Sequence, residues 1–413
     1  MTSLVRPVAL RTAATWFTLI ASVVFLFAAR ALIARVLGPA GIGTYALMLT
    51  AAWLAGTVLS LGLPAYNASF AGRQQAGILL SNSVAWNAAS LAVLSLVCPP
   101  ALASSALSLT HKAMIVGIWM APLMSLLECT RGVLQGTSAI AAYNWLGLTG
   151  GAINLAAVFW LVRTSRLTLR SAVACWIGST IVSAALALLL AVRREGLWPV
   201  DRSVLRASLK FGGQAWVSQL TGILNFRIAL LLTESFLGLA AVGLYSVAIT
   251  IAEVLFYFPN ALAVVTVSRY AAAGRQEARL LLARSAGWVL AVSAACAAGL
   301  AVVGGPVIER IFGPSYAPSA TVLRILLPGV VAYTPVAVTT WYFNAHVQKP
   351  IVNLIVAGFS VAVNASLTLV LAPAYGLAGV AWSTSIAYVS ASILNAALIR
   401  RESLRAATVM SGC

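Results

Sequence analysis

The stretch that decides the fold is LGPAGIGTY at residues 37–45, which recurs as LGLAAVGLY at residues 237–245. Five of the nine positions are identical, and each copy lies in a short gap between two long apolar runs. The two copies are 200 residues apart in a chain of 413 residues. A self-similarity at about half the chain length predicts that the protein consists of two versions of one structural unit.

The composition places both units in a membrane. Hydrophobic residues make up 61% of the chain and charged residues only 8%, whereas soluble proteins carry about 25% charged residues. Apolar runs of this length predict spanning helices, and the runs do not alternate as the strands of a spanning barrel would. The net charge of +18 lies mostly between the runs, which indicates topology signals and contacts with lipid headgroups and not nucleic-acid binding.

We therefore expect an all-α polytopic membrane protein with about twelve transmembrane helices. The expected spans are residues 12–36, 42–64, 77–98, 113–134, 142–163, 170–192, 211–235, 241–267, 282–303, 319–344, 350–372 and 377–399. Six spans separate the two copies, so the halves are predicted to be parallel repeats, an arrangement found in transporters. The predicted domains are an N-terminal lobe at 1–194, a cytoplasmic linker at 195–210 and a C-terminal lobe at 211–413.

The basic residues predict the orientation of the protein in the membrane, and the short loops leave no room for a catalytic domain. Seventeen lysines and arginines fall on the side of the N-terminus and seven on the other side, which predicts that both termini are cytoplasmic. Arg163, Arg166 and Arg170 go against this trend and leave the span count of the first half open. No loop exceeds about 18 residues, the five cysteines are scattered, and no GxxxxGK[ST] phosphate loop is present. We expect no catalytic activity, no metal and no cofactor.

The repeated phrase itself is predicted to be a tight turn between the first two helices of each lobe. Gly38 and Gly238 can adopt the left-handed conformation that ends a helix, and Pro39 enforces the stop in the first copy. Tyr45 and Tyr245 suit the aromatic belt at the membrane surface. The turn is primarily architectural, with a direct role in gating as the alternative.

Two arginines lie inside expected spans, where charged residues are rare and usually functional. Arg30 is eight residues before the repeated glycine of its half, and Arg227 is eleven residues before the glycine of the second half. The difference of three residues places both on corresponding helix faces, about one turn apart. A planar guanidinium suits a phosphate or pyrophosphate group. The alternatives are an arginine that reaches the membrane surface and one that is paired internally.

Further polar residues complete the list of candidates. Asn225, Gln219 and Trp216 share a span with Arg227 and are candidates to contact the substrate. Glu253 is either the counter-ion of Arg227 or a protonation site for ion coupling. Glu128 and Arg131 are three residues apart, which predicts a local ion pair, with a cytoplasmic gate as the alternative.

Four motifs resemble the polysaccharide-repeat (O-antigen type) flippases of the multidrug/oligosaccharidyl-lipid/polysaccharide (MOP) exporter superfamily. The motifs are RVLGP with GTYAL at residues 35–47, RGVLQG at 131–136, IFGPSY with LRIL at 311–326, and PAYGLAG at 373–379. The resemblance extends from about residue 10 to residue 400. It implies two six-helix lobes around a central cavity and the movement of undecaprenyl-pyrophosphate-linked glycans from the inner to the outer leaflet.

The resemblance also implies partners and a location. The partners would be a lipid-linked glycan and membrane lipids, with a polysaccharide polymerase and glycosyltransferases as further candidates, in a bacterial inner membrane. The first alternative is an ion-coupled multidrug or small-molecule antiporter of the same superfamily, for which cationic substrates would need carboxylates in their path. A membrane glycosyltransferase or ligase is the second alternative, although it usually needs a catalytic carboxylate in a sizeable loop.

Overall fold

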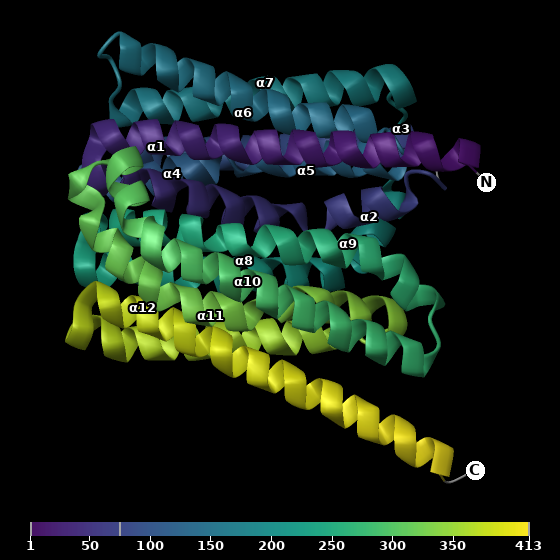
Figure 1. Ribbon diagram of the computed structural model, residues 1–413. Helices are drawn as coiled ribbons and strands as arrows, with labels where there is room; N and C mark the ends of the chain where they lie inside the picture. Colours follow the sequence, from purple (N-terminus) through teal and green to yellow (C-terminus); the bar gives the residue numbers. More distant parts are fainter. Residues whose placement is uncertain (1, 74–75, 412–413) are drawn as a thin grey trace. The chain divides into compact units, whose positions relative to one another are not determined.

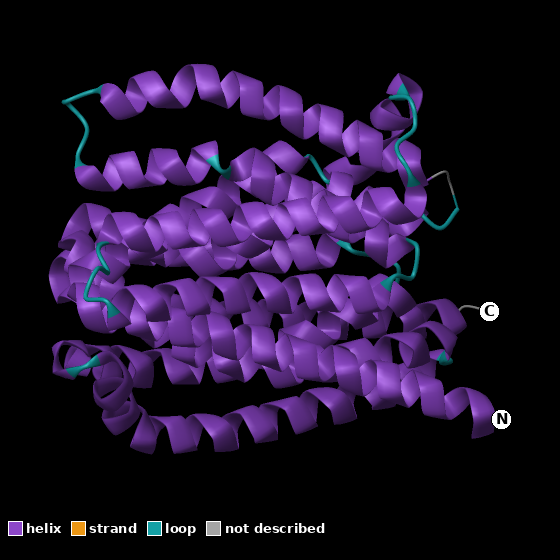
Figure 2. Ribbon diagram, turned by 90° about the horizontal axis from the view of Figure 1, so that it is seen from above, coloured by secondary structure: helices purple, strands orange, loops and turns teal. Residues whose placement is uncertain are grey.

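A computed structural model of the protein describes residues 2–73 and 76–411, and these residues form helices joined by short loops (Figure 2). Met1, Gln74, Gln75, Gly412 and Cys413 lie outside the described residues. The α-helices are α1 (Thr2–Ser60), α2 (Leu63–Phe70), α3 (Ala76–Ala103), α4 (Leu109–Trp119), α5 (Ala121–Gly136), α6 (Ile140–Arg163), α7 (Leu169–Glu195), α8 (Arg202–Ala252), α9 (Tyr257–Ala272), α10 (Arg275–Phe312), α11 (Ala317–Trp341) and α12 (Ile351–Ser411). Three short helical turns are η1 (Glu253–Phe256), η2 (Pro314–Tyr316) and η3 (Tyr342–His346).

Three glycines explain how these helices give the expected number of spans. The described residues contain nine helical segments that are long and apolar enough to cross a membrane. Three of the nine are bent at a glycine, at Gly38 in α1, Gly238 in α8 and Gly376 in α12, and each bend separates two spans. The prediction of about twelve spanning helices in an all-α fold is therefore confirmed.

The bends are a different conformation from the predicted left-handed helix cap. Gly38 has φ 68° and ψ −178°, and Gly238 has φ 75° and ψ 178°. This region of backbone space is open essentially to glycine alone. Because ψ is extended, the next helix starts directly after the bend. Pro39 therefore takes a place in the first turn of the new helix, where its missing N–H costs no hydrogen bond.

The third bend reveals a third copy of the phrase. Residues 376–380 read GLAGV, which matches GLAAV at residues 238–242 in four of five positions. The glycine three residues after the bend is packed tightly, because a Cβ at Gly379 would collide with the backbone of Leu371 and one at Gly41 would collide with the side chain of Leu37. In the first and third copies this glycine lets the two spanning helices at the bend approach closely, whereas the second copy has Ala241 at this position.

The contacts divide the chain into two compact units, Met1–Leu220 and Thr221–Cys413. In unit 1, α1 packs against α6 and α4, and in unit 2, α11 packs against α10 and α12; each helix can be followed by its label in Figure 1. Helix α8 begins in unit 1 and continues into unit 2.

The connection between α7 and α8 is short and bound to unit 1. Only residues 196–201 are non-helical. The Asn82 side chain forms two hydrogen bonds of 3.0 Å with the backbone of Asp201, donating to its carbonyl and accepting from its N–H. Farther along α8, Trp216 Nε1 donates to the carbonyl of Thr57 at 2.9 Å. The linker at 195–210 remains a prediction as a functional boundary between the lobes.

Candidate functional site

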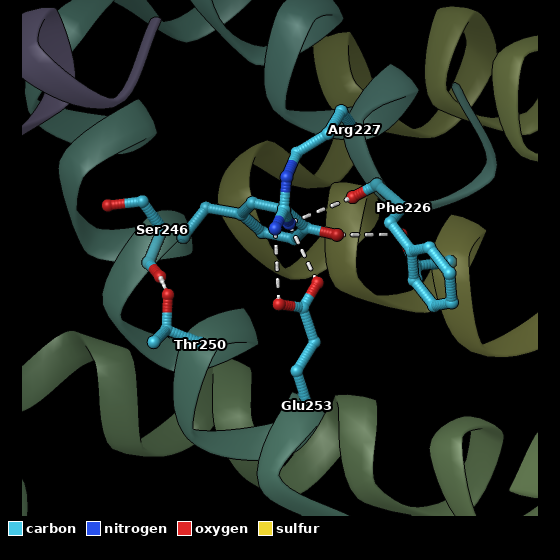
Figure 3. Close-up of polar contacts among 7 residues, drawn as sticks. Phe226, Arg227, Ser246, Thr250 and Glu253 are labelled. Carbon is cyan, nitrogen blue, oxygen red and sulfur yellow. Dashed lines mark hydrogen bonds and ion pairs between the residues drawn. The ribbon is translucent and has the colours of Figure 1, made fainter. Parts of the chain in front are cut away.

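An ion pair inside unit 2 is the centre of the candidate site (Figure 3). Arg227 Nη1 donates to Glu253 Oε1 at 2.7 Å, and Arg227 Nη2 donates to Glu253 Oε2 at 3.2 Å. The two side chains are 20% and 23% exposed. A two-pronged contact between a guanidinium and a carboxylate is among the strongest hydrogen-bonded pairs in proteins. In this structure Glu253 is therefore the counter-ion of Arg227.

The bend at Gly238 brings the two charges together. Arg227 lies before the bend, and Glu253 is the first residue of η1 after it. In a straight helix, residues 26 positions apart would be separated by about 39 Å along the axis. The bend turns the chain back so that the two side chains meet. The repeated phrase thus positions the site without contributing a charged group to it.

Aromatic and amide side chains surround the ion pair. Tyr388 and Tyr245 are both close enough to Arg227 and Glu253 to interact with them electrostatically. The ring of Tyr388 stacks on that of Tyr333, with centroids 4.7 Å apart. Asn225 Nδ2 donates to the Tyr333 hydroxyl at 3.3 Å. Within the described residues, Tyr388 Oη and Asn225 Oδ1 are buried polar atoms without a hydrogen-bond partner.

The tyrosine of the phrase is a buried packing residue, which corrects its assignment to the membrane surface. Tyr245 is only 1% exposed, and Tyr45 only 2%. The Tyr245 hydroxyl lies 2.9 Å from Thr384 Oγ1, which also accepts from Asn364 Nδ2 at 3.3 Å. A buried tyrosine usually finds a partner for its hydroxyl. These bonds tie the helix after the Gly238 bend to α12.

Unit 1 contains a similar arrangement around Arg30. Arg30 is partly buried in α1 and acts electrostatically on Tyr45, whose hydroxyl also lies beside Asn154. Asn154 and Asn364 are each followed by a similar apolar run, and both are buried. Each unit therefore contains an arginine, the tyrosine of the repeated phrase and an amide. The structure places Arg30 within electrostatic range of Tyr45 in its own unit.

The other predicted site residues lie apart from this arrangement. Trp216 and Gln219 belong to unit 1, where the Trp216 N–H is engaged by a backbone carbonyl and Gln219 is exposed. Arg131 Nη1 and Glu128 Oε1 form a local ion pair of 3.0 Å, with Glu128 53% exposed. The guanidinium of Arg131 also lies 5.2 Å from the ring centre of Tyr143. Among the described residues, no three His, Cys, Asp or Glu side chains gather to hold a metal.

Sequence reasoning missed Tyr388, Tyr333 and Thr384. These residues come from α11 and α12, far from Arg227 in the sequence, and nothing in their spacing marks them as neighbours. A signal was available for Tyr245 and Tyr45, because the phrase repeats this residue as faithfully as its glycines. A repeated tyrosine that follows a bend by seven residues points into the packed interior as readily as to the membrane surface.

Comparisons with known proteins agree with this fold. Residues 146–321 match a protein family described as "Polysaccharide biosynthesis protein". No curated protein has a significantly similar sequence. Two solved structures are similar over nearly the whole chain: an inward-facing multidrug resistance MATE family transporter of the MOP superfamily and the lipid II flippase MurJ in an inward closed conformation.

The structural likeness is strong although the sequences have diverged. The MATE transporter has a TM-score of 0.74 at 15% identity, covering 92% of this chain and 94% of its own. MurJ has a TM-score of 0.72 at 15% identity, covering 95% of this chain and 87% of its own. A MOP superfamily transporter from Pyrococcus furiosus has a TM-score of 0.59 at 14% identity, covering 95% and 94%. The likeness shows that the chain has the fold of these transporters, and the family match over residues 146–321 agrees with the resemblance to polysaccharide flippases.

Proposed function

We propose that this multi-pass membrane transporter of the MOP superfamily moves an undecaprenyl-pyrophosphate-linked oligosaccharide from the inner to the outer leaflet of a bacterial inner membrane. One observation carries the proposal. Each unit holds an arginine inside a spanning helix, beside the tyrosine of the repeated phrase. Two cations in corresponding helices of the two units, in a protein with few acidic residues, support an anionic substrate.

The chemistry of the headgroup matches these side chains. A pyrophosphate carries several oxygen acceptors, and the guanidinium fork binds such oxygens in pairs. The lipid tail would stay in the bilayer while the glycan follows the polar side chains. We assign Arg30 and Arg227 to headgroup binding in their respective units. The match of residues 146–321 to a polysaccharide-biosynthesis family supports a glycan as the cargo.

The site is less suited to the export of cationic drugs. A cationic substrate needs a carboxylate in its path, and both carboxylate oxygens of Glu253 are bonded to Arg227. Drug susceptibility of a strain that lacks the gene distinguishes the two functions. We expect no change in susceptibility and a loss of surface polysaccharide.

The experiment that tests the proposal replaces each arginine in the native host. Arg30→Ala and Arg227→Ala should each abolish or strongly reduce surface polysaccharide, while membrane levels of the protein stay normal. Arg166→Ala is the matched control, because Arg166 is an exposed arginine in the loop between α6 and α7. Wild-type polysaccharide in both site variants would rule out the assignment. A proteoliposome assay with a fluorescent lipid-pyrophosphate sugar measures the movement directly.

A further inference from the structure

We propose that Arg227 exchanges partners: a phosphate of the substrate displaces Glu253 from the guanidinium, and the Tyr388 hydroxyl donates a hydrogen bond to the anion that arrives. The inference rests on the proposed function and concerns the order of events at the same site. It makes Glu253 a competitor of the substrate and adds Tyr388 to the binding residues.

The first argument is the occupancy of Arg227. Both carboxylate oxygens of Glu253 accept hydrogen bonds from the two terminal nitrogens of Arg227, so the nitrogens that would bind a phosphate are already hydrogen-bonded. Carboxylates and phosphates compete for the same fork because both offer a pair of oxygens at similar spacing. A phosphate can therefore bind Nη1 and Nη2 of Arg227 together only where it replaces Glu253.

The second argument is that exchange avoids an unpaired cation. Removing one partner of a largely buried ion pair leaves an uncompensated charge, which is strongly unfavourable. Direct replacement of a carboxylate by a phosphate keeps Arg227 paired throughout. Glu253 is 23% exposed, so its carboxylate is not fully enclosed by protein.

The third argument is the local structure of Glu253. It is the first residue of η1, a four-residue 3-10 turn between α8 and α9. A 3-10 stretch within a helix often marks a hinge, because its hydrogen bonds are poorer than those of an α-helix. Pro259 follows shortly afterwards and has no N–H to bond the preceding turn. The carboxylate is thus carried by a segment whose helical hydrogen bonding is weaker than that of a regular α-helix.

The fourth argument is the hydroxyl of Tyr388. Its side chain is 1% exposed, and its hydroxyl has no hydrogen-bond partner among the described residues. Its ring lies edge-on to Phe226, the neighbour of Arg227, with centroids 6.3 Å apart, and to Phe256 of the turn that carries Glu253, with centroids 6.5 Å apart. Buried hydroxyls are nearly always bonded in native structures. A phosphate oxygen at Arg227 would give this hydroxyl the acceptor that it lacks.

The test measures the affinity of the full-length protein in nanodiscs for fluorescent farnesyl pyrophosphate at constant pH and salt. Inorganic pyrophosphate serves as the competitor that separates headgroup binding from lipid binding. We expect Arg227→Gln to weaken binding at least tenfold. Glu253→Gln should bind the probe about three- to tenfold more tightly than the wild type because the competing carboxylate is gone. The affinity of Glu253→Asp for the probe should lie between those of the wild type and Glu253→Gln. Tyr388→Phe should weaken binding at least threefold.

Two controls keep the result interpretable. Glu128→Gln removes a carboxylate from the exposed ion pair with Arg131 and should leave the affinity unchanged. The double variant Arg227→Glu with Glu253→Arg rebuilds an ion pair and should recover any unfolding temperature that Arg227→Gln loses. The recovered temperature distinguishes a loss of binding from a loss of folding.

The exchange and the proposed function fail in different ways. If Arg227→Gln loses binding while both Glu253 variants bind as the wild type does or more weakly, the exchange is overturned and the proposed function stands. If Arg227→Gln and Arg30→Ala both bind the probe normally, the proposed function falls as well. Wild-type affinity in Tyr388→Phe overturns the assignment of that hydroxyl.

Discussion

The bend at Gly238 provides the sharpest test of how this sequence makes its fold. A methyl group added at Gly238 would meet no neighbouring heavy atom within 4 Å, so a Gly238→Ala variant suffers no steric clash with the rest of the protein. Its cost is the strain of holding alanine at φ 75° and ψ 178°. Such conformations cost about 1–3 kcal/mol for a residue with a Cβ. The expected loss of stability therefore comes from the backbone alone.

Gly222 in the same helix is a matched control. A methyl group at Gly222 would also meet nothing within 4 Å, and its backbone is helical. Alanine is better than glycine in a helix interior by roughly 0.5–1 kcal/mol. Gly222→Ala should therefore stabilise the protein slightly, and the two variants should differ by about 1.5–4 kcal/mol. At about 1.4 kcal/mol for each factor of ten, this is a difference of roughly 10- to 700-fold in the unfolding equilibrium.

The assay is a denaturant titration of purified protein in detergent micelles, followed by tryptophan fluorescence. Gly38→Ala should cost nearly the same as Gly238→Ala, because its backbone angles match and its surroundings are equally open. Equal stabilities for the Gly238 and Gly222 variants would refute the reasoning, since only the backbone conformation distinguishes them.

Three further predictions concern single contacts. The Ser203 hydroxyl and two backbone N–H groups donate hydrogen bonds to the Asp201 carboxylate and hold its pKa below the usual range. The stability that these bonds contribute is complete above about pH 4 and is lost as the pH falls through the lowered pKa of Asp201. The difference in unfolding temperature between wild type and Asp201→Ala should therefore narrow in acid. Trp216→Phe removes the hydrogen bond to the Thr57 carbonyl and should lower the free energy of unfolding by about 1 kcal/mol, measured by denaturant titration. Surface polysaccharide should be retained. Loss of polysaccharide at unchanged stability would make Trp216 a substrate contact. Glu128→Ala should change stability by less than about 1 kcal/mol in the same titration, because exposed ion pairs contribute little, and a larger loss would indicate a structural gate.

The spans and their bends could be predicted from the sequence because local rules govern them. Apolar length specifies a spanning helix, and a glycine in a repeated phrase marks a turn. The ψ angle of Gly38 could not be predicted, since it depends on how the two helices pack on either side. The third bend at Gly376 was also missed as a repeat, because its copy of the phrase lacks the tyrosine.

The site could be predicted only where charge is rare. Arg227 and Glu253 attract attention because few charged residues lie in the apolar runs, and their contact follows from the bend between them. Tyr388 is one of 11 tyrosines, and only the packing of α12 places it beside the ion pair. Long-range packing depends on the shapes of many side chains at once, and no local pattern in the sequence records it.

The repeat fixes positions in the two units but leaves their charges free to differ. Glu253 follows Gly238 by 15 residues, and the residue 15 positions after Gly38 is Trp53, which is uncharged and 52% exposed. Unit 1 therefore has no carboxylate at the position from which Glu253 neutralises Arg227. The exchange proposed for Arg227 and Glu253 therefore has no counterpart at that position of unit 1. The same frame thus places the two arginines in different electrostatic surroundings at this position.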